Sequence, residues 1–212
     1  MLPLLVRPTS SPSLSSSMTP AVAPVPEVNT ARKMPGGRLL EVQLTQAIQN
    51  ALVKRFGPGK WLLPGPALMP YLNLELIKTR KLDPAKVEDV AADAARAQDH
   101  IARVYTRHDL QSGRVQQDAL GRAVSLSFYG PRSGDLYVLP EPYYLFDATG
   151  TSHGTPYTYD THVPLIFWGL GVKPGTYRES VAVNDVAPTL AAMLGLTEPS
   201  GSVGRVLSEI FE

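Results

Sequence analysis

Residues 147–169 read DATGTSHGTPYTYDTHVPLIFWG, a loop of small residues that leads into an apolar segment. The apolar part, Val163–Trp168, is typical of a strand that is buried on both faces of an α/β sheet. Helical and strand patterns are mixed through the rest of the chain. The sequence therefore predicts an α/β fold.

Periodic apolar residues predict the other elements. Helices are expected over about 40–56, over 84–104 with Asp83 as N-cap, over 115–124, and over 185–194 with Asn184 or Asp185 as cap and Gly195 after the last turn. Strands are expected at 71–75, 126–129, 135–139 and 163–168.

Composition limits the class of protein and its partners. The chain has 212 residues, enough for one domain with a core or for a piece of a larger domain. Hydrophobic residues make up 43% and charged residues 18%, which is typical of a globular chain. The net charge is +1, and no apolar run approaches the roughly 18 residues of a membrane span. The sequence therefore predicts neither nucleic-acid nor membrane binding, and it leaves the oligomeric state open.

The first 21 residues differ in composition from the rest. They are rich in Ser, Pro and Thr with Arg7 as the one charge, which predicts a flexible tail. Met1–Arg7 is a poor secretory signal because its basic residue follows the apolar ones, so the sequence alone leaves the localisation open. The chain opens with this tail and a helix, and its strands come late. We therefore expect the first half of the sheet to be missing.

The loop before the buried strand contains two histidines. Small residues around His153 let the backbone approach a ligand closely, and an imidazole there can bind a metal. The chain has no cysteine, so any transition metal needs His, Asp or Glu. A catalytic zinc takes three protein ligands, and the spacing supplies no third one. Spacing alone also fits a surface histidine and a histidine that is hydrogen-bonded in a turn. Asp160 could accept a hydrogen bond from an imidazole that binds a metal, or it could cap a turn.

Several segments together resemble a known family. They are VAPVPE at 22–27, PGGR at 35–38, SGDLY at 133–137, PYY at 142–144, residues 150–177, and VAVNDVAPTLAAMLGLTEPSGSVGRVL at 181–207. They are similar to the C-terminal portion of the PafA-like bacterial alkaline phosphatases, in the alkaline phosphatase / type I phosphodiesterase superfamily. The resemblance implies a partial three-layer sandwich, a mixed sheet with flanking helices whose N-terminal half is missing. Residues 22–212 would be its C-terminal part and 1–21 an unrelated or disordered tail.

The resemblance also implies a function. In this family two zinc ions clamp the hydrolysis of a phosphomonoester by a Thr or Ser nucleophile. Intact members are expected in the periplasm or outside the cell. His153 corresponds to a zinc ligand, while Asp160 and His162 correspond to positions that support the site or the fold. The nucleophile is expected upstream, so no catalytic residue is assigned.

One family motif is degenerate in this chain. An Asp-His-Gly motif directly precedes Val-Ala-Pro in the family, and here Thr19, Pro20 and Ala21 stand in its place. Pro and Ala cannot bind zinc, and a neutral Thr cannot replace a carboxylate. We therefore expect a truncated, inactive fragment of a phosphatase. The alternatives are a phosphodiesterase, phosphonate hydrolase or sulfatase-like member of the superfamily, or a non-enzymatic interaction module.

Four further residues receive structural interpretations. His100 and His108 are expected to be solvated beside a helix, and Trp61 and Trp168 are expected in the core.

Overall fold

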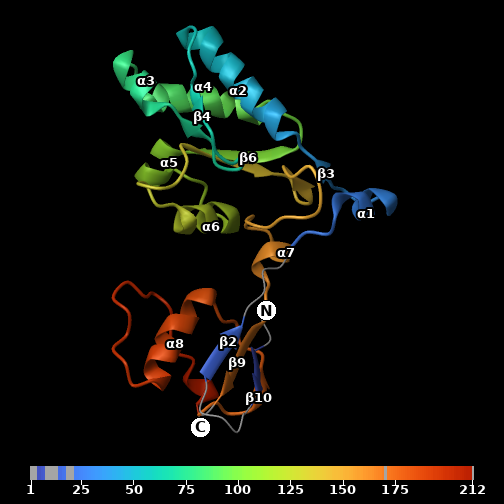
Figure 1. The fold of residues 1–212 in the computed structure, drawn as a ribbon, viewed down its shortest axis with the longest axis vertical. Coiled ribbons are helices and arrows are strands. Elements are labelled where there is room, and N and C mark those ends of the chain that lie inside the picture. Colours follow the sequence, from blue (N-terminus) through green and yellow to red (C-terminus); the bar gives the residue numbers. More distant parts are fainter. Residues whose placement is uncertain (1–3, 8–13, 18–21, 170, 212) are drawn as a thin grey trace. The chain divides into compact units, whose positions relative to one another are not determined.

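The computed structural model describes residues 4–7, 14–17, 22–169 and 171–211 (Figure 1). The chain divides into two compact units. The larger unit is Val22–Tyr157, and the smaller unit combines Met1–Ala21 with Thr158–Glu212. Among the described residues, every helix is too short or too polar to cross a bilayer.

The larger unit is built around a two-stranded antiparallel ladder of β6 (Ile101–Thr106) and β7 (Leu136–Pro140). Its described helices are α1 (Pro26–Ala31), α2 (Glu41–Phe56), α3 (Leu74–Thr79), α4 (Pro84–Arg96), α5 (Arg107–Ser112) and α6 (Ala119–Ser127). Two short pairs complete it, parallel β3 (Gly37–Arg38) with β8 (Tyr144–Leu145), and antiparallel β4 (Leu62–Leu63) with β5 (Tyr71–Leu72). Figure 1 shows α2 and α4 stacked over the ladder and α6 on its opposite side.

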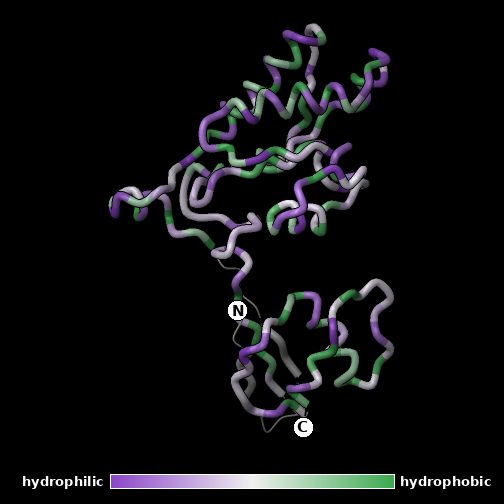
Figure 2. The backbone as a smooth tube through the Cα atoms, turned by 180° about the vertical axis from the view of Figure 1, so that it is seen from behind, coloured by the Kyte–Doolittle hydropathy of each residue, from purple (hydrophilic) through white to green (hydrophobic). Residues whose placement is uncertain are grey.

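The core of the larger unit lies between α2, α4 and the ladder. Apolar residues four positions apart line one side of each helix, so both helices bury a continuous stripe. The buried residues are Leu44, Ile48 and Leu52 on α2 and Val87, Ala91 and Ala95 on α4. Figure 2 shows hydrophilic and hydrophobic residues alternating along these helices. Trp61 is fully buried beside them, which confirms its predicted core position.

The start of α4 follows the expected chemistry, but its end does not. The Asp83 carboxylate accepts a hydrogen bond from Ala85 N at 3.0 Å, and Pro84 occupies the first turn, where no N–H is needed. The helix ends at Arg96, so the prediction that it continues to Val104 was wrong. Ile101 and Val104 belong to β6 instead, because pairing with β7 outweighs a three-residue spacing that fits a helix.

Two other predicted strands are partly helical in the structure. Asn73 Oδ1 accepts from Leu76 N at 3.0 Å and caps α3, so the strand expected at 71–75 stops at Leu72. The strand expected at 126–129 is instead the end of α6 and the loop after it. The helices over 40–56 and 115–124 and the strand at 135–139 were correct apart from their boundaries.

The smaller unit contains a four-stranded mixed sheet in the order β10–β1–β9–β2. Its elements are β1 (Leu4–Arg7), β2 (Leu14–Ser17), α7 (Thr158–Thr161), β9 (Leu165–Gly169), β10 (Gly175–Tyr177), η1 (Val183–Asp185), α8 (Val186–Met193) and η2 (Ser208–Ile210). β1 runs parallel to β9, whereas β10 and β2 are antiparallel to their neighbours. β1 and β2, the two described segments of the predicted tail, are therefore strands. That residues 1–21 are unrelated to the rest of the domain stays a prediction.

One side of β9 faces the core of the smaller unit. Leu165 and Phe167 are fully buried there with Val172, Leu207 and Ile210. Trp168 points the other way and is 45% exposed, so its predicted core position was wrong. The apolar run suggested a strand covered on both faces, but the side of β9 that carries Trp168 is open to solvent.

Asp185, one of the two predicted caps, is the N-cap residue of α8, but its side chain accepts no hydrogen bond from that helix. Its carboxylate is 6% exposed and accepts from Ala182 N and from Arg205 N, each at 2.8 Å. Gly195 follows the helix with φ +64°, as expected of a C-terminal glycine. One buried side chain thereby ties the helix start to the last segment of the chain.

Candidate functional site

His153 lies in the loop 146–157 of the larger unit, and Arg38 holds the first half of this loop. Arg38 Nη1 donates to Asp147 O at 2.7 Å, and Nη2 donates to Gly150 O at 2.9 Å. Arg38 Nε also donates to Glu27 Oε1 at 2.6 Å, and this hydrogen bond lowers the pKa of Glu27. The side chain of Arg38 is 17% exposed, so the guanidinium is set between the carboxylate and the loop.

The residues on either side of His153 are anchored separately. Thr151 Oγ1 donates to Ala23 O at 2.5 Å, and Tyr137 Oη donates to Gly154 O at 3.0 Å. Gly154 has φ +110°, in a region that favours glycine, which explains why a glycine follows His153. His153 itself is exposed. The imidazole is therefore presented to solvent from a backbone that is held at three points.

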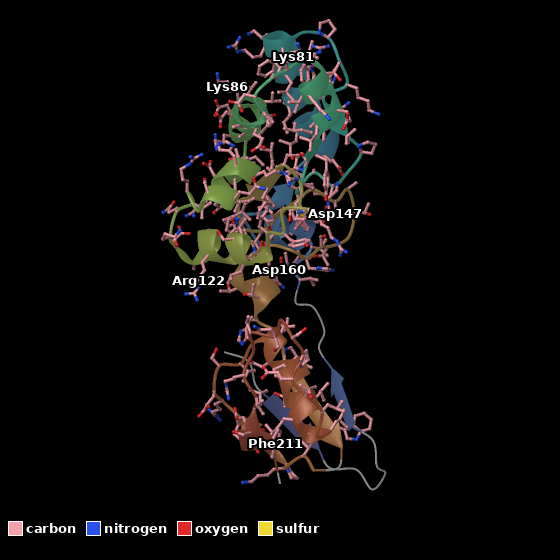
Figure 3. All side chains as sticks on the ribbon, turned by 90° about the vertical axis from the view of Figure 1, so that its left-hand side faces the viewer. Lys81, Lys86, Arg122, Asp147, Asp160 and Phe211 are labelled. Atoms are coloured by element: carbon pink, nitrogen blue, oxygen red, sulfur yellow. The ribbon has the colours of Figure 1, made fainter. Side chains whose placement is uncertain are left out.

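A groove of about 560 Å³ runs beside His153. Its walls come from the start of α2, the loop before β5, and the chain around β8. The lining residues are Leu40, Glu41, Val42, Pro66, Ala67, Leu68, Pro140, Tyr144, Leu145, Phe146, Asp147, Ala148, Ser152, His153 and Thr155. Of these residues, Asp147 is exposed (Figure 3). The groove therefore combines an apolar wall with one imidazole and the carboxylates of Glu41 and Asp147.

The described residues do not by themselves fit a zinc ion. Zinc in a catalytic site takes three protein ligands. Within the described ranges, no three His, Cys, Asp or Glu side chains come together in a way that could hold a metal. Thr19 and Pro20, the degenerate motif positions, lie outside the described residues. His153 is thus one potential ligand without partners of its own among the described residues.

Asp160 and His162 belong to the smaller unit. Asp160 lies on α7 and is partly buried, and His162 follows that helix directly and is exposed. His162 N donates to Thr158 O at 3.0 Å, so α7 ends with a closed turn. Their supporting role at a metal site stays a prediction.

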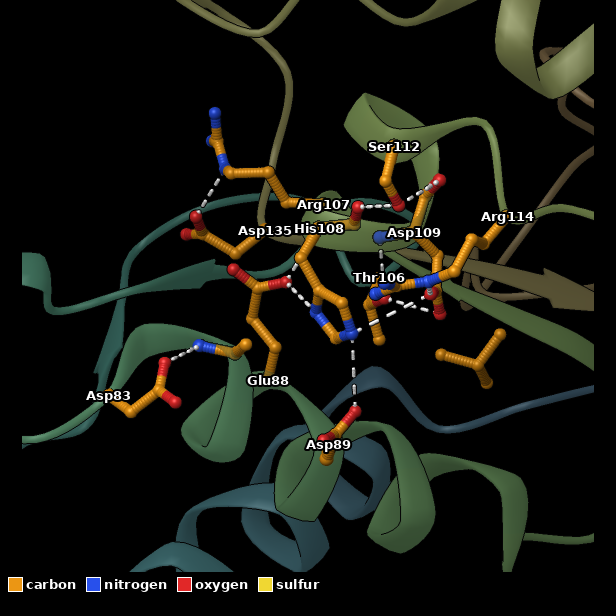
Figure 4. A network of polar contacts seen from close by, with 12 residues as sticks. Asp83, Glu88, Asp89, Thr106, Arg107, His108, Asp109, Ser112, Arg114 and Asp135 are labelled. Atoms are coloured by element: carbon orange, nitrogen blue, oxygen red, sulfur yellow. Dashed lines mark hydrogen bonds and ion pairs between the residues drawn. The ribbon is translucent and has the colours of Figure 1, made fainter.

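The larger unit contains a buried polar network that was not predicted from the sequence (Figure 4). Glu88 is 3% exposed and accepts from His108 N at 2.9 Å, and its Oε2 lies 2.9 Å from His108 Nδ1. Burial raises the pKa of Glu88, while the hydrogen bonds from His108 act in the opposite direction. The interpretation of His108 as a solvated residue was therefore wrong.

A second buried carboxylate lies beside this pair. Asp135 is 1% exposed and accepts from Arg107 Nε and from Leu72 N, each at 2.7 Å. Together the two carboxylates join α4, α5, β5 and β7. The partners are 20 to 63 residues apart in the chain, so only the folded structure reveals the network.

The fold matches part of a known structure. A solved structure of alkaline phosphatase PafA matches 94% of this chain and 38% of its own length, with a TM-score of 0.80 and 23% identity. This match confirms the predicted α/β class and the partial alkaline-phosphatase-like fold.

Sequence relatives agree with the structural match. Alkaline phosphatase PhoV of Synechococcus elongatus is 29% identical over 184 residues, which cover 85% of this chain and 32% of PhoV. PafA of Elizabethkingia meningoseptica is 25% identical over 182 residues, covering 85% of this chain and 33% of PafA. PhoK of Sphingomonas sp is 29% identical over 199 residues, covering 86% of this chain and 35% of PhoK. No family model matches the chain.

These findings confirm the resemblance to PafA-like alkaline phosphatases. The chain spans about a third of the length of the relatives it matches.

Proposed function

We propose that this chain is part of a zinc-dependent phosphatase-type hydrolase, to which it contributes one metal ligand, His153. The observation that carries the proposal is the match to three alkaline phosphatases over about 85% of the chain. The anchored loop supports it, because a ligand on a backbone held at three points loses little freedom when it binds a metal.

We also propose that the chain alone does not hydrolyse phosphate esters. A single imidazole cannot hold a zinc ion in competition with water, since catalytic zinc needs three protein ligands. The motif that would supply further ligands reads Thr19, Pro20 and Ala21 in this chain. What the chain's own residues do is therefore limited to positioning His153 and shaping the groove beside it.

The isolated chain provides the first test. Purified protein is assayed with p-nitrophenyl phosphate and added zinc, beside a His153→Ala variant. We expect both proteins to show the same background rate. A rate above background that disappears in the variant would show that the chain is an enzyme by itself.

The class of ester is tested in a hybrid protein. Residues 22–212 replace the matching segment of PhoV, and the hybrid is assayed on a phosphomonoester, a phosphodiester, a phosphonate ester and a sulfate ester. The proposal expects the monoester to be hydrolysed fastest. Preference for any other ester would favour the corresponding alternative within the superfamily.

A further inference from the structure

We propose that the groove beside His153 binds an uncharged aromatic group, that Tyr144 is the residue which contacts this group, and that His100 positions Tyr144. We further infer that this aromatic group is part of a phosphate ester, and this step rests on the proposed function. The binding of an aromatic group in the groove does not depend on the proposed function.

The size and lining of the groove define its occupant. A volume of about 560 Å³ is in the range of small-molecule pockets. Leu40 and Val42 are 51% and 64% exposed, and both line the groove, so they offer adjacent apolar surface to a ligand. The carboxylates of Glu41 and Asp147, which line the groove, repel an anionic group of a ligand. An uncharged aromatic group satisfies both conditions.

The ring of Tyr144 is half-buried and is held by close contacts with His100 and Gly37. It stacks on the imidazole of His100 with 3.9 Å between ring centroids and 13° between planes. It also packs against Gly37, where an added Cβ would lie 2.9 Å from Tyr144 Cε1. A larger residue at position 37, in the pair of β3 and β8, would therefore force the ring of Tyr144 or its surroundings to shift.

Two strained residues maintain this arrangement. His100 has φ +61° and Tyr143 has φ +68°, a region that residues other than glycine rarely adopt. His100 Nδ1 lies 2.9 Å from Glu141 Oε2, and His100 O accepts from Glu141 N at 2.8 Å. Strain of this kind persists only where the surroundings enforce it, and it concentrates at ligand sites. Here it serves to keep one ring at the wall of the groove.

The Tyr144 hydroxyl is available to a ligand. It makes no hydrogen bond with the residues that the structure describes, although the side chain is only partly exposed. A phenol can both donate and accept a hydrogen bond. Tyr144, which lines the groove, thus offers aromatic surface to a ligand and a hydroxyl to an oxygen that the ligand carries.

The test uses the full 212-residue chain and 1-naphthol, an aromatic alcohol without phosphate. Binding is followed by the fluorescence of the naphthol. We expect saturable binding that is weakened about tenfold or more by Tyr144→Ala and by Val42→Asp, since each removes apolar contact with the ring. Two matched substitutions outside the groove, Tyr129→Ala and Val203→Asp, replace exposed residues and should leave binding unchanged.

His100 is tested as a positioning residue by His100→Asn. Asparagine tolerates a positive φ, so this variant removes the stacked ring while the backbone conformation is retained. We expect naphthol binding to weaken about threefold to tenfold, which is less than for Tyr144→Ala. The NMR signals of the Tyr144 ring should lose the shift caused by the stacked imidazole, a change that general destabilisation would not produce.

Several results would overturn the inference. They are the absence of naphthol binding, binding that Tyr144→Ala and Val42→Asp leave intact, or an unchanged Tyr144 ring signal in His100→Asn. If Tyr144→Ala fails to fold, Val42→Asp decides, because its side chain is mostly exposed. Naphthol binding needs neither metal nor phosphate, so an inactive PhoV hybrid would overturn the proposed function and leave this inference standing.

Discussion

Replacing His108 with alanine tests the buried network directly. The carboxylate of Glu88 is 3% exposed and receives two hydrogen bonds from residue 108, one from the ring Nδ1 and one from the backbone N, each at 2.9 Å. The substitution removes the first and keeps the second. A carboxylate would then remain buried with one of its two partners.

The expected cost follows from these contacts. A hydrogen bond to a charged group contributes about 1.5–3 kcal/mol, and leaving a buried acceptor with fewer donors adds a desolvation cost. The remaining backbone N–H and the 22% exposed side chain of His108 reduce the loss. We expect His108→Ala to lower the free energy of unfolding by about 2–3 kcal/mol at pH 7. The loss should shrink at low pH, because Glu88 then takes up a proton and a neutral carboxyl is less costly to leave buried with one hydrogen bond fewer.

The chain offers a convenient probe for this measurement. Trp61 is buried in the larger unit, and Trp168 is the other tryptophan. Urea unfolding followed by Trp61 fluorescence in a Trp168→Phe background therefore reports on the larger unit. Arg122→Ala, an exposed substitution on α6 (Figure 3), should stay within about 0.5 kcal/mol of the parent.

A second variant separates the pair from general damage. In His108→Ala with Glu88→Gln, no charge is left buried, so part of the lost stability should return. If His108→Ala costs less than about 0.5 kcal/mol, the reasoning about the buried carboxylate is refuted.

Three further substitutions test other parts of the account. Burial raises the pKa of Glu88 above 4.5, so the folded chain holds a proton that the unfolded chain releases, and stability falls as pH rises from about 4.5 through the raised pKa. Glu88→Gln should lack this fall in urea titrations across pH 4.5–7, and parallel profiles would count against it. Asp185→Ala leaves the N–H groups of Ala182 and Arg205 without their acceptor. The free energy of unfolding of the smaller unit should therefore drop by about 2–4 kcal/mol, with a smaller drop for Asp185→Asn. Amide hydrogen exchange on α8 measures this, and unchanged protection would argue against the role of Asp185. Gly37→Ala places a Cβ 2.9 Å from Tyr144 and should cost about 1–3 kcal/mol in urea unfolding, more than Gly130→Ala, whose nearest neighbour is a flexible Gln111 side chain at 3.4 Å. Equal costs would contradict the close packing.

The sequence predicted those elements whose pattern is local. The stripe on α2 and the Asp83 cap of α4 are both visible within a few residues, and the structure contains both. Ile101 and Val104 were misassigned because a spacing of three fits a helix, and only pairing with β7 makes them a strand. Trp168 was misplaced because an apolar run does not show which faces of a sheet are covered.

The candidate site was predictable in the same limited way. His153 and Gly154 are adjacent, so their pairing could be read from the chain. Arg38, which holds the loop, is 109 residues from Asp147 and 112 from Gly150. The stacking of His100 on Tyr144 likewise joins residues that are distant in sequence. Such contacts depend on tertiary structure, and no local pattern encodes them.

The PhoV hybrid shows whether His153 supplies a metal ligand. Bound zinc is measured by mass spectrometry in the hybrid and in its His153→Ala variant, with His162→Ala as the matched control, and p-nitrophenyl phosphate hydrolysis is recorded alongside. We expect the His153→Ala hybrid to lose bound zinc and more than about 100-fold of its activity. The His162→Ala hybrid should lose about tenfold of its activity or less. Full zinc content and full activity in His153→Ala would contradict the account.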